Sequence, residues 1–235
     1  MSVPILLLSV AWAIPVAAGS VYFPLEPRAM WSYVGDEGGA EHVFIGGTQV
    51  VIGVETVVRH VEVQSQLYGE SFENFWTSSG DGDVWLHGFT NETFSLSYDP
   101  PILWFDAPLE VGKTWSTTTQ PFGDLEGKVP FDDPFTITIG VISEQEIVVP
   151  AGKFFAYEVG QVPPGIRLSL NSGVFDFSGQ HLDAFDRGDN FNDWVSYGVG
   201  IVRFRGLEHY VLETFDFPVS VEPQSWSRLK SLYRQ

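Results

Sequence analysis

The chain has 235 residues and a formal net charge of −18, because 30 Asp and Glu outnumber 12 Lys and Arg. This balance argues against nucleic acid as a partner, since binding it requires basic side chains that displace counterions. The absence of cysteine excludes disulfides, thiolate metal sites and thiol nucleophiles.

The composition predicts an antiparallel β protein. Aromatic residues make up 15% of the chain, and 24 Gly and 15 Pro leave few stretches long enough for a helix. Aromatic and β-branched residues favour strands, and turn formers separate them. We expect one domain over residues 20–220, because all-β domains of this size are common.

The first 18 residues are typical of a signal peptide. An apolar centre, residues 3–16, is followed by the small residues Ala17 and Ala18. A buried strand or a membrane anchor is the alternative, although the segment is short and interrupted for a membrane span. We therefore predict an extracytoplasmic protein, periplasmic, secreted or on the cell surface, with no membrane span after processing.

The first strands follow Pro24 and Pro27, which impose an extended backbone. Residues 30–34 form the first predicted strand, and residues 42–67 form two more with a turn at Gly46-Gly47. Arg59 falls on the apolar face of the second of these. Either a bulge changes the strand register or Arg59 is buried against a carboxylate.

Further hairpins follow along the chain. Residues 80–83, Gly-Asp-Gly-Asp, predict a turn, since these residues tolerate positive φ. Residues 135–149 alternate clearly between apolar and polar side chains, which indicates a half-buried strand. The sequence Val-Pro-Ala-Gly at 149–152 predicts a simple hairpin corner, and a last hairpin turns near Gly206.

About ten to twelve strands result, each with one apolar face. Such strands predict a single curved antiparallel sheet that forms a barrel or an open half-barrel. A short C-terminal helix completes the predicted fold.

Several motifs in order resemble secreted bacterial envelope proteins of the domain-of-unknown-function 3108 type. They are "YFPLEPRAMWSYVG", "GVETVVRHVEV", "GDGDVWLHG", "LEVGKTWSTT", "IVVPAGKFFAYEV" and "YGVGIVRF". The resemblance covers most of residues 22–217. It implies a curved antiparallel sheet in the envelope or outside the cell, without catalytic residues to transfer. The chain departs from the group by lacking a lipoprotein cysteine and by inserting an acidic segment, residues 171–193.

That acidic segment is the candidate metal site. Oxygen ligands at close spacing are what calcium requires, although the spacing differs from the EF-hand loop. Calcium is the one cofactor that the sequence suggests, and a solvated loop is the alternative reading. The candidate ligands are Asp183, Asp186, Asp189, Asn190 and Asp193.

Aromatic side chains on nearly every strand allow two interpretations. They fill a core, or they line a cavity for an apolar or amphipathic ligand such as a lipid. The candidates for a cavity are Trp76, Trp85, Phe155, Tyr157, Trp194 and Tyr197.

Residues 221–235 differ from the body. They carry three basic residues and Glu222, whereas residues 1–220 carry nine basic and 29 acidic residues. Trp226, Leu229 and Tyr233 share one helical face. A docked or frayed terminal helix and a docking peptide for an envelope or export protein are both open. The docking candidates are Trp226, Arg228, Lys230, Tyr233 and Arg234.

No nucleophile elbow, zinc-protease motif, phosphate loop or dinucleotide fingerprint occurs in the chain. We therefore predict a secreted non-enzymatic barrel-like protein that binds or carries an apolar or amphipathic ligand. One alternative is a cell-surface structural or interaction protein attached through its basic tail. Another is a hydrolase whose site forms only in three dimensions.

Overall fold

The computed structural model describes residues 22–64, 69–92, 94–125, 134–162, 169–170, 173–174, 192–205 and 209–217. These residues form an all-β structure, as predicted. The signal peptide at residues 1–18 and the tail helix at residues 221–235 lie outside the described residues. The described part contains no helix long and apolar enough to cross a membrane.

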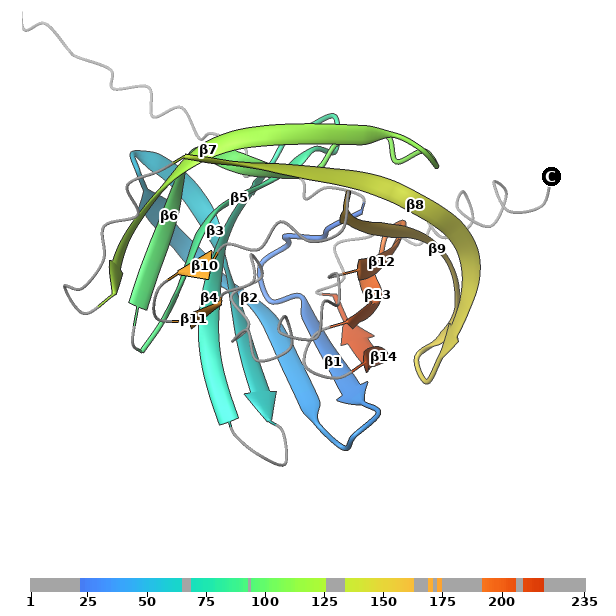
Figure 1. Ribbon diagram of the computed structural model, residues 1–235. Coiled ribbons are helices and arrows are strands. Elements are labelled where there is room, and N and C mark those ends of the chain that lie inside the picture. The colour runs from blue at the N-terminus through green and yellow to red at the C-terminus, as the bar shows by residue number, and fades with distance from the viewer. Residues whose placement is uncertain are drawn as a thin grey trace, which may run out of the picture.

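Twelve antiparallel strands form a closed barrel, so the sheet does not stay open (Figure 1). A separate pair consists of β10 (Ser169–Leu170) and β11 (Gly173–Val174). The barrel strands are β1 (Met30–Gly35), β2 (Ala40–Val51), β3 (Val54–Gln64), β4 (Gly69–Ser78), β5 (Val84–Asn91), β6 (Phe94–Phe105), β7 (Thr114–Leu125), β8 (Phe135–Val149), β9 (Gly152–Gln161), β12 (Asn192–Ser196), β13 (Gly200–Arg205) and β14 (His209–Asp216).

The first and last strands close the barrel, since β1 pairs with both β14 and β2. Two side chains of β1 reinforce the closure. The indole Nε1 of Trp31 donates to the carbonyl of Val199 at 2.8 Å, and the hydroxyl of Tyr33 donates to the carbonyl of Ile201 at 3.0 Å. The strands at the two ends of the chain therefore depend on each other.

Alternation of side chains along the strands sorts the core from the outer surface, as expected for period-two strands. On β8, Ile137, Ile139 and Val141 are buried. Thr136 and Thr138 face outward and make hydroxyl pairs with β7, for example Ser116 with Thr138 at 2.7 Å. The predicted alternation of this strand is confirmed.

The predicted turn at Gly46-Gly47 is wrong. β2 continues through both glycines, and the turn falls at Ile52 and Gly53. The register shifts between Ile45 and Thr48, which is a bulge. The ring of His60 lies so close to Gly46 that a Cβ there would overlap it. The glycine therefore marks a close approach of a side chain to the backbone, which glycine in a strand also signals.

The corner at Val149 to Gly152 is confirmed as a hairpin turn. Val149 pairs with Gly152, where φ is 141°. The backbone N–H of Ala151 in the turn donates to the carbonyl of Leu212 at 3.1 Å, which fastens the hairpin to β14.

The backbones of the paired strands β5 and β6 approach each other closely at Gly88. The register shifts beside it, and a Cβ at this position would lie 2.9 Å from the Cα of Ser97 and still closer to the carbonyl of Leu96. Since both neighbours are backbone atoms of β6, they can yield only if the strands separate. His87, next to it, is buried and its Nε2 lies 2.8 Å from the Thr77 hydroxyl.

We expect Gly88→Ala to lower the free energy of unfolding by about 3 kcal/mol, because strand separation adds to the strain of overpacking. Urea unfolding would measure this change. Gly47→Ala is the matched control, since nothing lies within 4 Å of a Cβ there. Equal effects of the two substitutions would contradict the close approach at Gly88.

Burial lowers the pKa of His87 below its ordinary value of 6.5. The unfolded chain therefore binds this proton more readily than the folded barrel does. Stability should fall as the pH drops through about 6.5 and toward the folded pKa. Urea unfolding at pH 8 and pH 5 should show a smaller loss for His87→Gln than for the unmodified protein. Identical losses would assign the pH dependence to other groups.

Candidate functional site

Five polar side chains gather inside the barrel, and we name them the interior polar cluster. They come from five different strands and are Tyr33, Glu41, Arg59, Asn74 and Asp193. Each stands at a position where strand alternation places neighbouring apolar residues in the core.

Arg59 is buried against a carboxylate, which was one of the two explanations that the sequence left open. Its guanidinium lies 3.7 Å from Glu41, and the two side chains are 12% and 2% exposed. The guanidinium carbon also lies 5.9 Å from the ring centroid of Phe23. A buried ion pair loses much of its attraction to desolvation, but removing one partner leaves an uncompensated charge.

Tyr33 lies within the electrostatic reach of this pair. Burial raises the pKa of its hydroxyl far above the ordinary value of 10; the charge of Arg59 lowers it, while Glu41 and Asp193 raise it. The phenol therefore stays protonated and serves as the donor to Ile201 described above.

A cavity of about 40 Å³ adjoins the cluster. Its lining residues are Phe23, Glu41, Arg59, Phe72, Asn74, Trp76, Trp104, Asp193, Ile201, Phe204 and Arg205.

Two buried lining atoms, Asn74 Oδ1 and Trp76 Nε1, have no hydrogen-bond partner. A single water needs about 10–15 Å³, so the cavity has room for roughly three. Such waters could satisfy both atoms. Ligand pockets of about 300–1,000 Å³ are far larger.

The six aromatic residues predicted to line one cavity lie in different places. Trp76 lines the interior cavity. Trp194 is buried under the guanidinium of Arg203, which lies 4.3 Å from the ring centroid. Trp85 is half-buried between Val84 and Leu86, which both point into the core, so its side chain faces outward.

The other three lie together outside the cavity. Tyr22 contacts Tyr157 and Tyr197 edge to face, with ring centroids 6.1 and 5.7 Å apart, and Phe155 contacts Tyr157 at 6.1 Å. Phe155 and Tyr197 remain exposed. Binding of a ligand by the six residues stays a prediction.

Of the five predicted calcium ligands, the structure describes one. Asp193 belongs to the interior polar cluster, whereas Asp183, Asp186, Asp189 and Asn190 lie outside the described residues. Within the described ranges, no three His, Asp or Glu side chains are grouped to hold a metal ion. The tail candidates, residues 226–234, are likewise outside the described part of the chain.

A second feature is the barrel end that we name the hairpin rim. In an antiparallel barrel alternate turns lie at the same end. The rim therefore contains the turns that join β2 to β3, β4 to β5, β6 to β7, β8 to β9 and β12 to β13.

Exposed apolar side chains gather at this rim. Ten large apolar residues are exposed in the described part of the chain. Phe122 lies away from the rim turns, and Ile142 follows Val141, whose backbone bonds to Gly112 and Lys113 of the β6–β7 turn. The other eight are in a rim turn, within four residues of one, or at the start of β1: Met30, Val50, Ile52, Val54, Val111, Val148, Phe155 and Tyr197.

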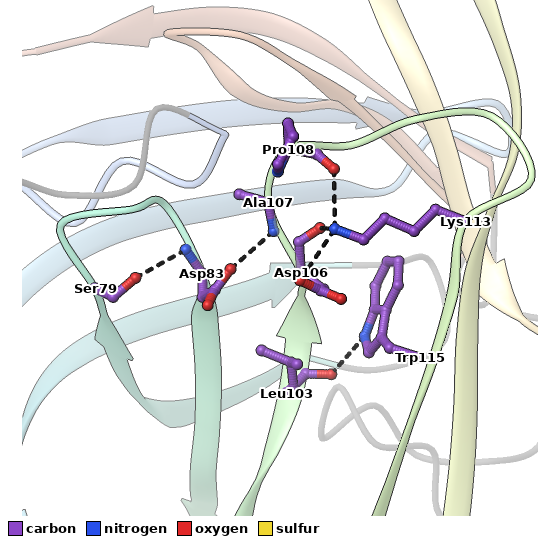
Figure 2. A network of polar contacts seen from close by, with 8 residues as sticks. All are labelled: Ser79, Asp83, Leu103, Asp106, Ala107, Pro108, Lys113 and Trp115. Atoms are coloured by element: carbon purple, nitrogen blue, oxygen red, sulfur yellow. Dashed lines mark hydrogen bonds and ion pairs between the residues drawn. The ribbon is translucent and has the colours of Figure 1, made fainter.

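Polar contacts hold the β6–β7 turn in shape and join it to the β4–β5 turn, as Figure 2 shows. The carboxylate of Asp83 accepts a hydrogen bond from the backbone N–H of Ala107 at 2.9 Å. Within the β6–β7 turn, the ammonium group of Lys113 pairs with the Asp106 carboxylate at 3.0 Å and donates to the carbonyls of Asp106 and Pro108. These two rim turns are therefore held in place by polar contacts.

Comparison with solved structures finds two similar chains of bacterial origin. A candidate exported protein with a YmcC-like fold from Bacteroides fragilis has 13% identity and a TM-score of 0.47, over 84% of this chain and 100% of that chain. A candidate lipoprotein from Parabacteroides distasonis has 11% identity and a TM-score of 0.42, over 84% and 99%. No protein-family model and no curated protein matches the chain, so the resemblance to the 3108 type stays a prediction.

Sequence reasoning missed Glu41, Asn74 and the rim. The alternation that marked Arg59 as unusual also places Glu41 on the same strand face as Val43 and Ile45, so the burial of Glu41 could have been predicted. The rim was not, because its residues are far apart in the sequence and meet only through the barrel topology.

We expect Arg59→Met to lower the free energy of unfolding by about 3–5 kcal/mol, since Glu41 would remain buried without its cation. Glu41→Leu should have a similar effect, and the double variant should recover most of the loss. Urea unfolding of the four proteins completes a double-mutant cycle. Additive losses would show that the two side chains are energetically independent.

Proposed function

We propose that this protein is an exported, non-enzymatic interaction protein, in which the barrel is a packed scaffold and the hairpin rim is the interaction surface. The observation that carries the proposal is the gathering of eight exposed apolar side chains at one barrel end. Exposed apolar patches of monomeric proteins often mark interaction sites.

Export is supported by the sequence. Residues 1–18 have the apolar centre and small-residue end of a signal peptide. The resemblance to envelope proteins points to the same compartment. An extracytoplasmic location also suits a chain that contains no cysteine, since its stability does not depend on the redox state.

The cavity beside the interior polar cluster does not favour an apolar carrier. A lipid-sized cargo needs several hundred Å³, and this cavity of the described residues offers about 40 Å³. Its lining also includes the Glu41–Arg59 ion pair, which an apolar ligand would leave without water.

Site-specific photocrosslinking would test the rim. With a photoreactive phenylalanine at Ile52 or Val111, irradiation of cells that export the protein should give crosslinked adducts, because these side chains are expected to touch a partner. The same group at Phe122, exposed to a similar degree at the other end of the barrel, should give few or none. Equal or absent crosslinking at all three positions would contradict the proposal.

A second candidate is binding of a small polar ligand in the interior cavity. It is favoured by the two buried polar atoms without partners, the acceptor Asn74 Oδ1 and the donor Trp76 Nε1. A hydroxyl group could bond to both. Native mass spectrometry of the exported protein should then show an added mass that disappears in Asn74→Leu. If the spectrum shows no added mass, and if Asn74→Leu is as stable as the unmodified protein, the cavity holds only water.

A further inference from the structure

We propose that the hairpin rim docks on a lipid surface, with the β2–β3 turn inserted among neutral, zwitterionic lipids. This inference rests on the proposed function, because it names the partner of the same surface. It follows from the backbone of one turn, from the positions of the chain ends and from the charge around the rim.

Ile52 is unfavourable at its position in two independent ways. Its φ is 46°, in the left-handed region that β-branched residues rarely adopt. Its side chain is 51% exposed. The two-residue turn with Gly53, where φ is 77°, strongly prefers Asn or Gly at the position of Ile52. An apolar contact outside the barrel would offset both disadvantages.

The hairpin around Ile52 presents a small apolar tip on a firm base. Val50 and Val54 flank the turn and are exposed. Below them, the hydroxyl of Thr56 donates to the carbonyl of Gln49 at 2.8 Å. A separate buried cluster of Val51, Val58 and Phe75 supports the same hairpin. The tip is therefore held in place, so its exposure does not result from a loose loop.

Both ends of the described chain lie at the rim. β1 runs away from the rim and β14 runs toward it, with Met30 paired with Asp216. The sequence after residue 217 continues into the basic tail, in which Trp226 and Tyr233 fall on one face of the predicted helix. This tail has the basic and aromatic composition of membrane-binding peptides. It is joined to the barrel end that carries the apolar tips.

The distribution of the exposed side chains suits a lipid surface better than a protein groove. They stand on separate turns around a ring, from β2–β3 to β6–β7 and β8–β9. A lipid surface can accept side chains from separate turns, whereas a groove on a protein accepts one segment. The exposed Glu55, Asp81 and Glu110 at the rim would be repelled by anionic headgroups, which favours zwitterionic lipid.

Vesicle sedimentation tests the proposal with the exported full chain, its mature N-terminus established by intact mass. The protein should sediment with phosphatidylcholine vesicles. Ile52→Asn should weaken partitioning about fivefold, and the triple variant Val50→Thr, Ile52→Asn, Val54→Thr roughly fiftyfold, from the apolar area withdrawn from the lipid. Phe122→Asn, a side chain 50% exposed on β7 far from the rim, should change it less than about twofold.

Ile52→Asn also separates a binding defect from misfolding. Asn tolerates the left-handed conformation, so this variant should unfold at the same or a higher urea concentration than the unmodified chain. A loss of vesicle binding with equal or greater stability supports the proposal.

Three outcomes would overturn it. Ile52→Asn binding as tightly as the unmodified chain would exclude the tip, and binding only to phosphatidylglycerol vesicles would exclude a neutral surface. The third outcome is that the protein does not bind vesicles and forms a dimer in sedimentation equilibrium that Ile52→Asn dissociates. The rim would then bind a second copy of the chain. If rim crosslinks then formed only to protein, the interaction surface would stand and the lipid assignment would fail.

Discussion

Closure of twelve strands is the constraint on which the rest of this structure depends. Eight strands enclose a space that their own side chains fill, and larger barrels tend to leave a lumen. This barrel fills the additional space with large aromatic residues and with residues 22–29, which precede β1 and run inside the ring of strands (Figure 1). The ring of Phe23 lies 4.7 Å from Trp76 and 5.7 Å from Phe105. The N-terminal segment is therefore part of the core.

The filling of the barrel explains the character of its interior. Large aromatic residues leave irregular gaps, and the remaining gap is bordered by the Glu41–Arg59 pair and by Asn74. Burying charge in this way stabilises a fold little compared with apolar packing. Removing either partner, however, would leave the other charge buried without compensation. The pair therefore limits which substitutions this part of the core tolerates.

The sequence predicted the features that depend on local periodicity. The all-β class, the alternation of β8, the corner at Val149 to Gly152 and the unusual position of Arg59 on an apolar face follow from residues within one or two strands. The turn at Gly46-Gly47 was misplaced, because glycine indicates a turn and a close approach equally well, and only the His60 ring decides between them. The six aromatic candidates lie at different places in the barrel, and their binding of a ligand stays a prediction. Which side of the sheet each aromatic side chain faces depends on bulges, such as the register shift in β5 beside Trp85. The apolar–polar alternation of the sequence does not reveal such bulges.

The pairing of the first strand with the last also orders events in time. β1 is synthesised first, yet its partner β14 begins 174 residues after the end of β1, at His209 after Gly35. Until β14 arrives, one edge of β1 has no strand to bond with, and the core around Phe23 cannot be enclosed. A chain that crosses a membrane from its N-terminus would therefore wait, partly open, for its last strand. Such long-range pairing slows folding and exposes strand edges to aggregation, so correct folding of this barrel depends on protection of β1 during that interval.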